Sequence, residues 1–196
     1  MRFGPCLLAV SVTVLLFSTA CSPAQDSPLF GPGGFAFSGK WKCDGSFPAN
    51  GKKYEHHALY EGRIVSGGKW IELTQKDTLP STYDATMLIG YDTNKKEVVN
   101  YVADNQGWGV LTGPGWQGHS LTLTMTGEAS YPGFSAEKPL PVSRVTYQVK
   151  SADAFSLQWE VRQGSEWRPD DTLDCVRPES AGSKAGNDGS PSPQAG

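Results

Sequence analysis

Apolar and polar residues alternate along most of the chain, at the spacing of β-strands with one buried face. The clearest runs are Leu121–Thr126, Val145–Lys150 and Phe155–Arg162, in which every second residue is apolar and the residues between are polar or charged. The remaining strands are predicted over Tyr54–Val65, Lys69–Lys76, Ala85–Tyr91, Glu97–Ala103 and Trp108–Thr112, with an opening strand from Gly39 and a closing strand near Asp171–Val176.

Short turn sequences separate these runs. Ser66-Gly67-Gly68 is a hairpin signal, and only Ala129–Pro141 is longer, with prolines that argue against a strand. Consecutive strands joined this tightly form a meander, and a long meander curls until its two edges pair. The pattern therefore predicts an all-β fold, an antiparallel meander of about nine or ten strands closed into a barrel.

The two ends of the chain differ in composition from the predicted barrel. Residues 21–37 and 179–196 are rich in Pro, Gly and Ser, which predicts a flexible linker and a disordered tail. The barrel is expected over 38–178, enough for one hydrophobic core. Residues 1–20 have the pattern of an export signal, in which Arg2 precedes an apolar run, Cys6–Phe17, that is too short to span a bilayer.

Cys21 is a candidate site of lipidation. Phe17-Ser18-Thr19-Ala20-Cys21 resembles a bacterial lipobox, with Ser18 where that motif usually has Leu. Acylation of Cys21 would anchor the protein to a membrane, and Ser22 resembles the outer-membrane sorting pattern. We therefore expect a lipoprotein of the bacterial cell envelope that faces the periplasm, in the outer rather than the inner membrane. Simple secretion is the alternative.

Two cysteines remain in the expected mature domain, because Cys6 leaves with the signal and Cys21 carries the lipid. Exported proteins fold in an oxidising compartment, where a cysteine pair usually forms a bridge. We expect a disulfide between Cys43 and Cys175, with two buried free thiols as the alternative.

Charge and motifs exclude several functions. The net charge is −3 and no basic run is present, so no nucleic-acid partner is expected. The sequence has no phosphate-binding loop, nucleophile elbow or His-Glu-x-x-His motif. Most aspartates lie at predicted strand ends, where they are interpreted as turn caps. We assign no catalytic residue and do not expect an enzyme, and the closed barrel favours a monomer.

Gly39-x-Trp41 ahead of a strand meander resembles the calycin superfamily, which includes lipocalins, fatty-acid-binding proteins and the haem-binding nitrobindins. A narrower resemblance, over about 140 residues, is to an exported bacterial lipocalin-like family, the domain of unknown function number 1579. It implies a lipocalin-like barrel and assigns no activity. The motifs that carry it are Trp41-x-Cys43-x-Gly45, Gly90-Tyr91-Asp92, Asp104-Asn-x-Gly107-Trp108-Gly109, Gly115-Trp116-x-Gly118, Thr126-Gly127-Glu128 and Trp167…Cys175.

The resemblance also implies a barrel with a closed floor. Gly39 and Trp41 would form this floor, with an arginine of the last strands covering the tryptophan. Arg162 is the first candidate for that arginine and Arg177 the second. The interior would hold a small hydrophobic or amphipathic ligand, or else be filled by side chains. The inward-facing candidates are Tyr54, His56, Met87, Tyr91, Tyr101, Leu123, Met125, Tyr147 and Trp159.

The histidines do not suggest a metal or haem. Alternation points His56 inward and His57 outward, and His119 lies in a predicted turn, so no convergent metal site is expected. Nitrobindin-like barrels have a glycine where Cys43 stands and a haem-ligating histidine on a late strand, whereas no histidine follows His119. No cofactor is therefore expected.

Together these features predict an exported, lipid-anchored barrel that binds a small hydrophobic or amphipathic ligand. The alternative is a filled barrel that serves as a structural or interaction protein of the cell envelope. An enzyme on a calycin scaffold is a third hypothesis.

Overall fold

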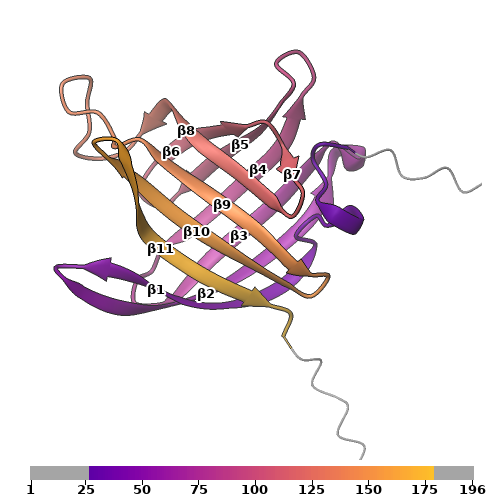
Figure 1. The fold of residues 1–196 in the computed structure, drawn as a ribbon, viewed down its shortest axis with the longest axis horizontal. Coiled ribbons are helices and arrows are strands. Elements are labelled where there is room, and N and C mark those ends of the chain that lie inside the picture. The colour runs from indigo at the N-terminus through magenta and orange to yellow at the C-terminus, as the bar shows by residue number, and fades with distance from the viewer. Residues whose placement is uncertain (1–26, 179–196) are drawn as a thin grey trace, which may run out of the picture.

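The computed structural model describes residues 27–178 and shows an all-β barrel (Figure 1). Ten antiparallel strands form it, each paired with the next around the barrel, and pairing of β1 with β11 closes it. A short additional strand, β7 (Trp116–Gln117), pairs only with β8. The barrel strands are β1 (Gly39–Ala49), β2 (Lys52–Val65), β3 (Trp70–Leu79), β4 (Asp84–Asp92), β5 (Glu97–Asp104), β6 (Trp108–Gly113), β8 (Ser120–Ser130), β9 (Ser143–Ser151), β10 (Ala154–Gln163) and β11 (Glu166–Val176).

The predicted fold class is confirmed. Alternation produces it directly: on β9, Ser143, Val145, Tyr147 and Val149 are buried and the residues between them are not. The helical content is two short 3-10 turns, η1 (Pro32–Gly34) and η2 (Ser66–Gly68). No helix among residues 27–178 is long and apolar enough to cross a membrane. The predicted export signal, Cys21 and the predicted tail lie outside the described residues.

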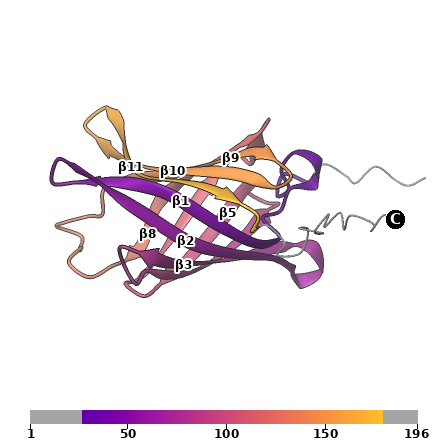
Figure 2. The ribbon, with the colours of Figure 1, turned by 90° about the horizontal axis from the view of Figure 1, so that it is seen from below.

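The barrel has two different ends (Figures 1 and 2). The β1–β2 and β10–β11 hairpins and the β8–β9 loop lie at one end, which we call the mouth. The segment that precedes β1 lies at the opposite end, together with η2, and we call this end the floor.

Residues 27–37 pack into the floor, although the sequence placed them in a flexible linker. Leu29, Phe35 and Phe37 are buried in the hydrophobic core. Gly62 on β2 allows this approach, because a Cβ at that position would stand 2.2 Å from the Phe37 carbonyl oxygen. The hydrophobic spacing of this segment has no regular period, so the pattern that revealed the strands did not reveal its burial.

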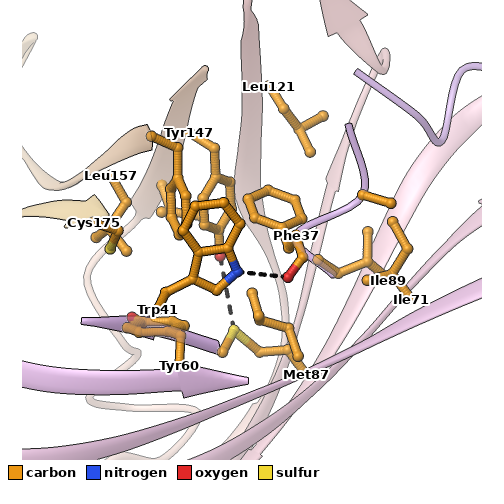
Figure 3. Close-up of a cluster of buried hydrophobic side chains, with 14 of the residues drawn as sticks. Phe37, Trp41, Tyr60, Ile71, Met87, Ile89, Leu121, Tyr147, Leu157 and Cys175 are labelled. Carbon is orange, nitrogen blue, oxygen red and sulfur yellow. Dashed lines mark hydrogen bonds between the residues drawn. The ribbon is translucent and has the colours of Figure 1, made fainter. Parts of the chain in front are cut away.

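Trp41 lies at the centre of the floor, as predicted (Figure 3). Its Nε1 donates a hydrogen bond to the Phe37 carbonyl oxygen at 2.7 Å, and its ring meets Phe155 edge-on at 4.9 Å between centroids. Aromatic pairs prefer this arrangement, and the packing fills the floor with side chains.

The arginine over Trp41 is Arg177, so the first-choice prediction of Arg162 was wrong. The Arg177 guanidinium lies 4.3 Å from the centre of the Trp41 ring, in a cation–π contact. Arg162 pairs with Trp167 at the β10–β11 hairpin, which lies at the mouth, and its side chain is exposed. Gly39 has φ +93°, and a Cβ there would stand 2.5 Å from Arg177 Nη1, so a larger residue would displace the arginine.

The predicted disulfide is confirmed. Cys43 on β1 and Cys175 on β11 are directly opposite partners in the closing ladder, and both are buried. The bridge therefore fixes the first strand to the last across 132 residues of sequence.

Candidate functional site

The mouth half of the barrel contains a cavity of about 460 Å³. Loop residues such as Pro80, Tyr83 and Tyr131 surround its opening, and Tyr60 and Tyr147 separate it from the aromatic floor. Its volume lies within the range of small-molecule sites, about 300–1,000 Å³. The apolar wall is formed by Met87, Val102, Leu111, Met125, Val145, Leu157 and Trp159.

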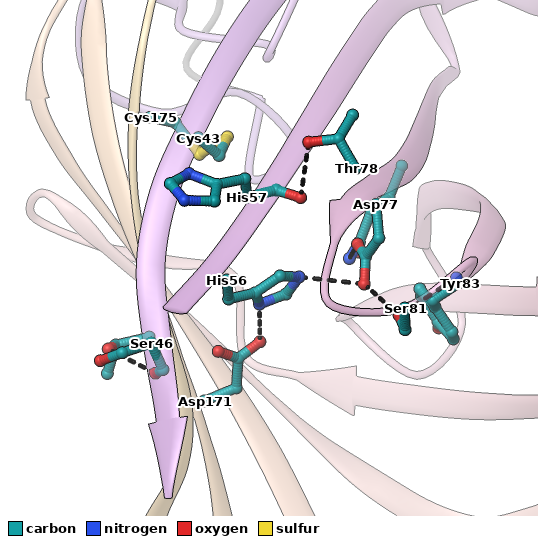
Figure 4. A network of polar contacts seen from close by, with 12 residues as sticks. Cys43, Ser46, His56, His57, Asp77, Thr78, Ser81, Tyr83, Asp171 and Cys175 are labelled. Atoms are coloured by element: carbon teal, nitrogen blue, oxygen red, sulfur yellow. Dashed lines mark hydrogen bonds and ion pairs between the residues drawn. A yellow bond between two sulfur atoms is a disulfide. The ribbon is translucent and has the colours of Figure 1, made fainter. Parts of the chain in front are cut away.

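His56 is the polar centre of the cavity wall (Figure 4). It is 5% exposed, and its Nδ1 lies 2.8 Å from Oδ2 of Asp171 on β11 in a hydrogen bond. Its Nε2 lies 3.0 Å from Oδ2 of Asp77 on β3, an ion-pair distance without hydrogen-bond geometry. The imidazole is therefore held between two carboxylates from strands on either side of it.

This arrangement sets the charges of His56 and Asp77. Burial disfavours the imidazolium, but the contacts with Asp171 and Asp77 outweigh it and raise the pKa of His56 to about 9. Burial likewise opposes the charge of Asp77, but His56, Gln75 and Ser81 together lower the pKa of that carboxyl. His56 is thus a cation at neutral pH, and Asp77 is an anion.

The network has neither the geometry of a catalytic triad nor that of a metal site. A triad needs a nucleophile bonded to the imidazole, but Ser81 Oγ donates to Asp77 Oδ2 at 2.8 Å and both ring nitrogens face carboxylates. Among residues 27–178, no group of three or more His, Cys, Asp or Glu side chains could hold a metal ion. The neighbouring histidine, His57, does not belong to this network, because its ring points to the outer face and its Nδ1 contacts Oδ1 of Asp44.

Asn100 adds a second polar position to the cavity wall. It lies on β5 among inward-facing residues and is 1% exposed. Its Oδ1 has no hydrogen-bond partner within residues 27–178. Buried polar side-chain atoms are normally paired, so an unpaired amide oxygen at a cavity is a candidate ligand contact.

Asp104 joins the loops at the mouth. Its Oδ2 accepts hydrogen bonds from the hydroxyls of Tyr83 at 3.1 Å and Tyr131 at 3.0 Å. Its Oδ1 accepts from the backbone N–H groups of Gln106 and Gly107, so it also caps the β5–β6 turn, as the sequence indicated for such aspartates. Burial and the Asp104 charge raise the pKa of both tyrosines, which keeps them protonated as donors.

Five of the predicted interior residues line the cavity: His56, Met87, Met125, Tyr147 and Trp159. Leu123 instead belongs to the buried core, and Tyr91 is partly buried and packs against that core.

Two predicted interior residues are exposed. Tyr101 is 49% exposed on the outer face, because Val98, Asn100 and Val102 are the inward residues of β5. Tyr54 is 39% exposed and stacks on Phe47 in the β1–β2 hairpin at the mouth.

Sequence reasoning missed Asp77, Asp171 and Asn100. Asp77 continues the inward alternation of Ile71 and Leu73, and Asp171 precedes the inward Leu173 and Cys175 at the same spacing. The signal was therefore present for the two aspartates, but aspartates near strand ends were interpreted as turn caps, and Asn100 was not considered.

A model of the family described as "Protein of unknown function (DUF1579)" matches residues 36–169, more than half of the chain. The chain belongs to the DUF1579 family. The match begins at the floor segment and ends in β11, so it covers nearly the whole barrel and most of the cavity lining, and it ends just before Asp170 and Asp171. A search among curated proteins finds no match to the chain.

Proposed function

We propose that this DUF1579 protein is an exported, lipid-anchored barrel that binds a small amphipathic molecule in its mouth cavity. The observation that supports this most directly is the cavity itself, about 460 Å³ with an apolar wall and a few polar groups. A filled barrel acting only through its surface has no need of such a space. The Cys43–Cys175 disulfide supports export, because disulfides persist in oxidising compartments.

Native mass spectrometry of the protein purified from its own host tests ligand binding. We expect a small molecule to remain bound under native conditions and to be released on denaturation. Val102→Phe should prevent its retention by filling the cavity, whereas Ala103→Phe, at the next and exposed position of β5, should not. Absence of a bound molecule, together with no uptake of the neutral probe N-phenyl-1-naphthylamine, would refute the binding hypothesis.

Fractionation of Cys21→Ser tests the anchor. Loss of the acylated residue should move the protein from the membrane to the soluble fraction, since acyl chains hold a protein at the bilayer by about 0.8 kcal/mol per buried CH₂. Cys43→Ser is the matched control, because Cys43 lies in the disulfide, and it should stay with the membrane. Unchanged membrane association of Cys21→Ser would contradict the anchor.

A further inference from the structure

The charged groups that line the cavity are mostly of one sign. Asp77, Asp170 and Asp171 contribute carboxylates, His56 contributes the single imidazole, and no Lys or Arg is among the lining residues of the described chain. Burial and the neighbouring Asp171 carboxyl raise the pKa of Asp170. Apolar walls strengthen the field of such a group, so the cavity attracts cations.

Several hydrogen-bond donors of the lining are already used within the protein. Both nitrogens of His56 face carboxylates. The Gln75 amide donates to Asp77, and the Tyr60 hydroxyl donates to Gln75. Other hydroxyls that line the cavity also have partners in the described residues. Ser81 donates to Asp77, and Tyr147 donates to the sulfur of Met87. Tyr83 and Tyr131 both donate to Asp104.

Two buried acceptor oxygens at the cavity are left without a partner in the part of the chain that the structure describes. Oδ1 of Asn100 is buried at the cavity without a partner in residues 27–178, and so is Oδ1 of Asp171. Asn100 lies on β5, separate from the strands that carry the aspartates, so it is an observation independent of the acidic group. A ligand that satisfies these oxygens must bring N–H or O–H groups of its own.

The rest of the lining fits an organic cation with an apolar body. Aromatic rings of Phe47, Tyr83, Tyr131 and Trp159 line the cavity, and aromatic faces attract cations. Met87 and Met125 offer flexible thioether side chains that adapt to the shape of an apolar group.

We propose that the cavity selects a small amphipathic organic cation, an amine whose N–H groups lie against the carboxylates of Asp77, Asp170 and Asp171. Its apolar body lies along the methionine wall, and Asn100 accepts a hydrogen bond from a donor deeper in the cavity. This inference rests on the proposed function, because it requires that the cavity bind a small molecule. Anionic amphiphiles are disfavoured by the same carboxylates.

Three probes of equal chain length test this selection: octylamine, octanol and octanoate, each used to displace N-phenyl-1-naphthylamine at pH 7. We expect octylamine to bind about tenfold more tightly than octanol, the ratio that corresponds to about one charge-assisted hydrogen bond. Octanoate should bind more weakly than octanol. Equal binding of octylamine and octanol, or tightest binding of octanoate, overturns the cation preference and leaves the proposed function standing. If no probe binds and the dye is not taken up, both fall.

Asp170→Asn isolates the charge effect, because Asp170 is exposed at the mouth and does not contact His56. It should weaken octylamine binding by about two- to fivefold, as expected for a partly exposed charge pair, and leave octanol binding unchanged. Asp84→Asn makes the same charge change on the outer face, where the side chain is exposed, and should have no effect. An equal effect of the two variants on octylamine would overturn the proposal, because it would indicate surface attraction instead of binding in the cavity.

Discussion

His56 is an imidazole whose protonation is set by its position inside the barrel. The ordinary pKa of histidine is about 6.5, and the two carboxylates raise that of His56 to about 9. The folded chain therefore holds this proton more tightly than the unfolded chain. The resulting stability is fully present below about pH 6.5 and is lost as the pH rises through about 9. Asp77 has the opposite dependence, because its lowered pKa gives stability that is lost on acidification.

Thermal unfolding between pH 6 and pH 9.5 tests the role of His56. The melting temperature of the wild type should fall by several degrees across this interval. His56→Gln should melt lower at neutral pH, because it leaves Asp77 and Asp171 without a cation, and should lose most of the pH dependence. His119→Gln, in an exposed turn, should keep the wild-type profile. A wild-type slope in His56→Gln would show that other groups cause the dependence.

Single residues show how far alternation predicts a site. His56 was placed inward by its spacing from Ala58 and Tyr60, and this holds because a regular strand fixes the face of each side chain. The prediction for Tyr101 was wrong because both alternating sets of positions in β5 contain apolar residues, so the pattern does not show which set faces inward. Asn100, in the other set, is the buried residue. Asparagine and aspartate inside a barrel contradict the usual preference for apolar interiors. Such exceptions gather at functional sites, where sequence patterning alone is least informative.

At the scale of elements, the floor depends on a segment that belongs to no strand. Phe37 is 1% exposed and meets Tyr147 and Phe155 edge-on at 5.0 and 5.2 Å between ring centroids. Its carbonyl accepts the Trp41 hydrogen bond, so one residue supplies both packing and a polar partner for the floor.

Replacement of Phe37 by Ala should therefore be costly. Removal of a buried phenylalanine typically lowers the free energy of unfolding by about 3–5 kcal/mol, and urea unfolding followed by tryptophan fluorescence measures it. Phe134→Ala is the matched control, since Phe134 is 41% exposed in the β8–β9 loop, and should change stability by less than about 0.5 kcal/mol. Similar stabilities of the two variants would mean that the segment contributes little to the floor.

The strands were predictable and this segment was not, for a physical reason. A strand repeats its burial every two residues, so several residues report the same structure. Residues 27–37 contain Pro and Gly, and the burial of Leu29, Phe35 and Phe37 depends largely on tertiary contacts, such as those of Phe37 with Tyr147 and Phe155. Their local composition indicates a linker, and tertiary packing overrides it.

At the scale of the whole molecule, closure of the barrel joins the first strand to the last. The β1–β11 ladder runs from Lys42 opposite Val176 to Ser46 opposite Thr172, and the Cys43–Cys175 bridge lies within it. Asp171 lies on the closing strand, one residue beyond this ladder, and holds His56 of β2. Closure therefore also assembles the polar wall of the cavity.

Removal of the disulfide separates the effect of the bridge on stability from the effect of β1–β11 pairing on the shape of the cavity. A bridge across 132 residues restricts the unfolded chain, and the chain-entropy relation gives a stabilisation of about 5 kcal/mol for such a loop. The double variant Cys43→Ala/Cys175→Ala should lose about this much free energy of unfolding in guanidinium titrations. Its uptake of N-phenyl-1-naphthylamine at low temperature should persist, because backbone pairing of β1 with β11 still closes the barrel. Loss of dye uptake in a variant that remains folded would show that the bridge, and not the ladder, holds the cavity in shape.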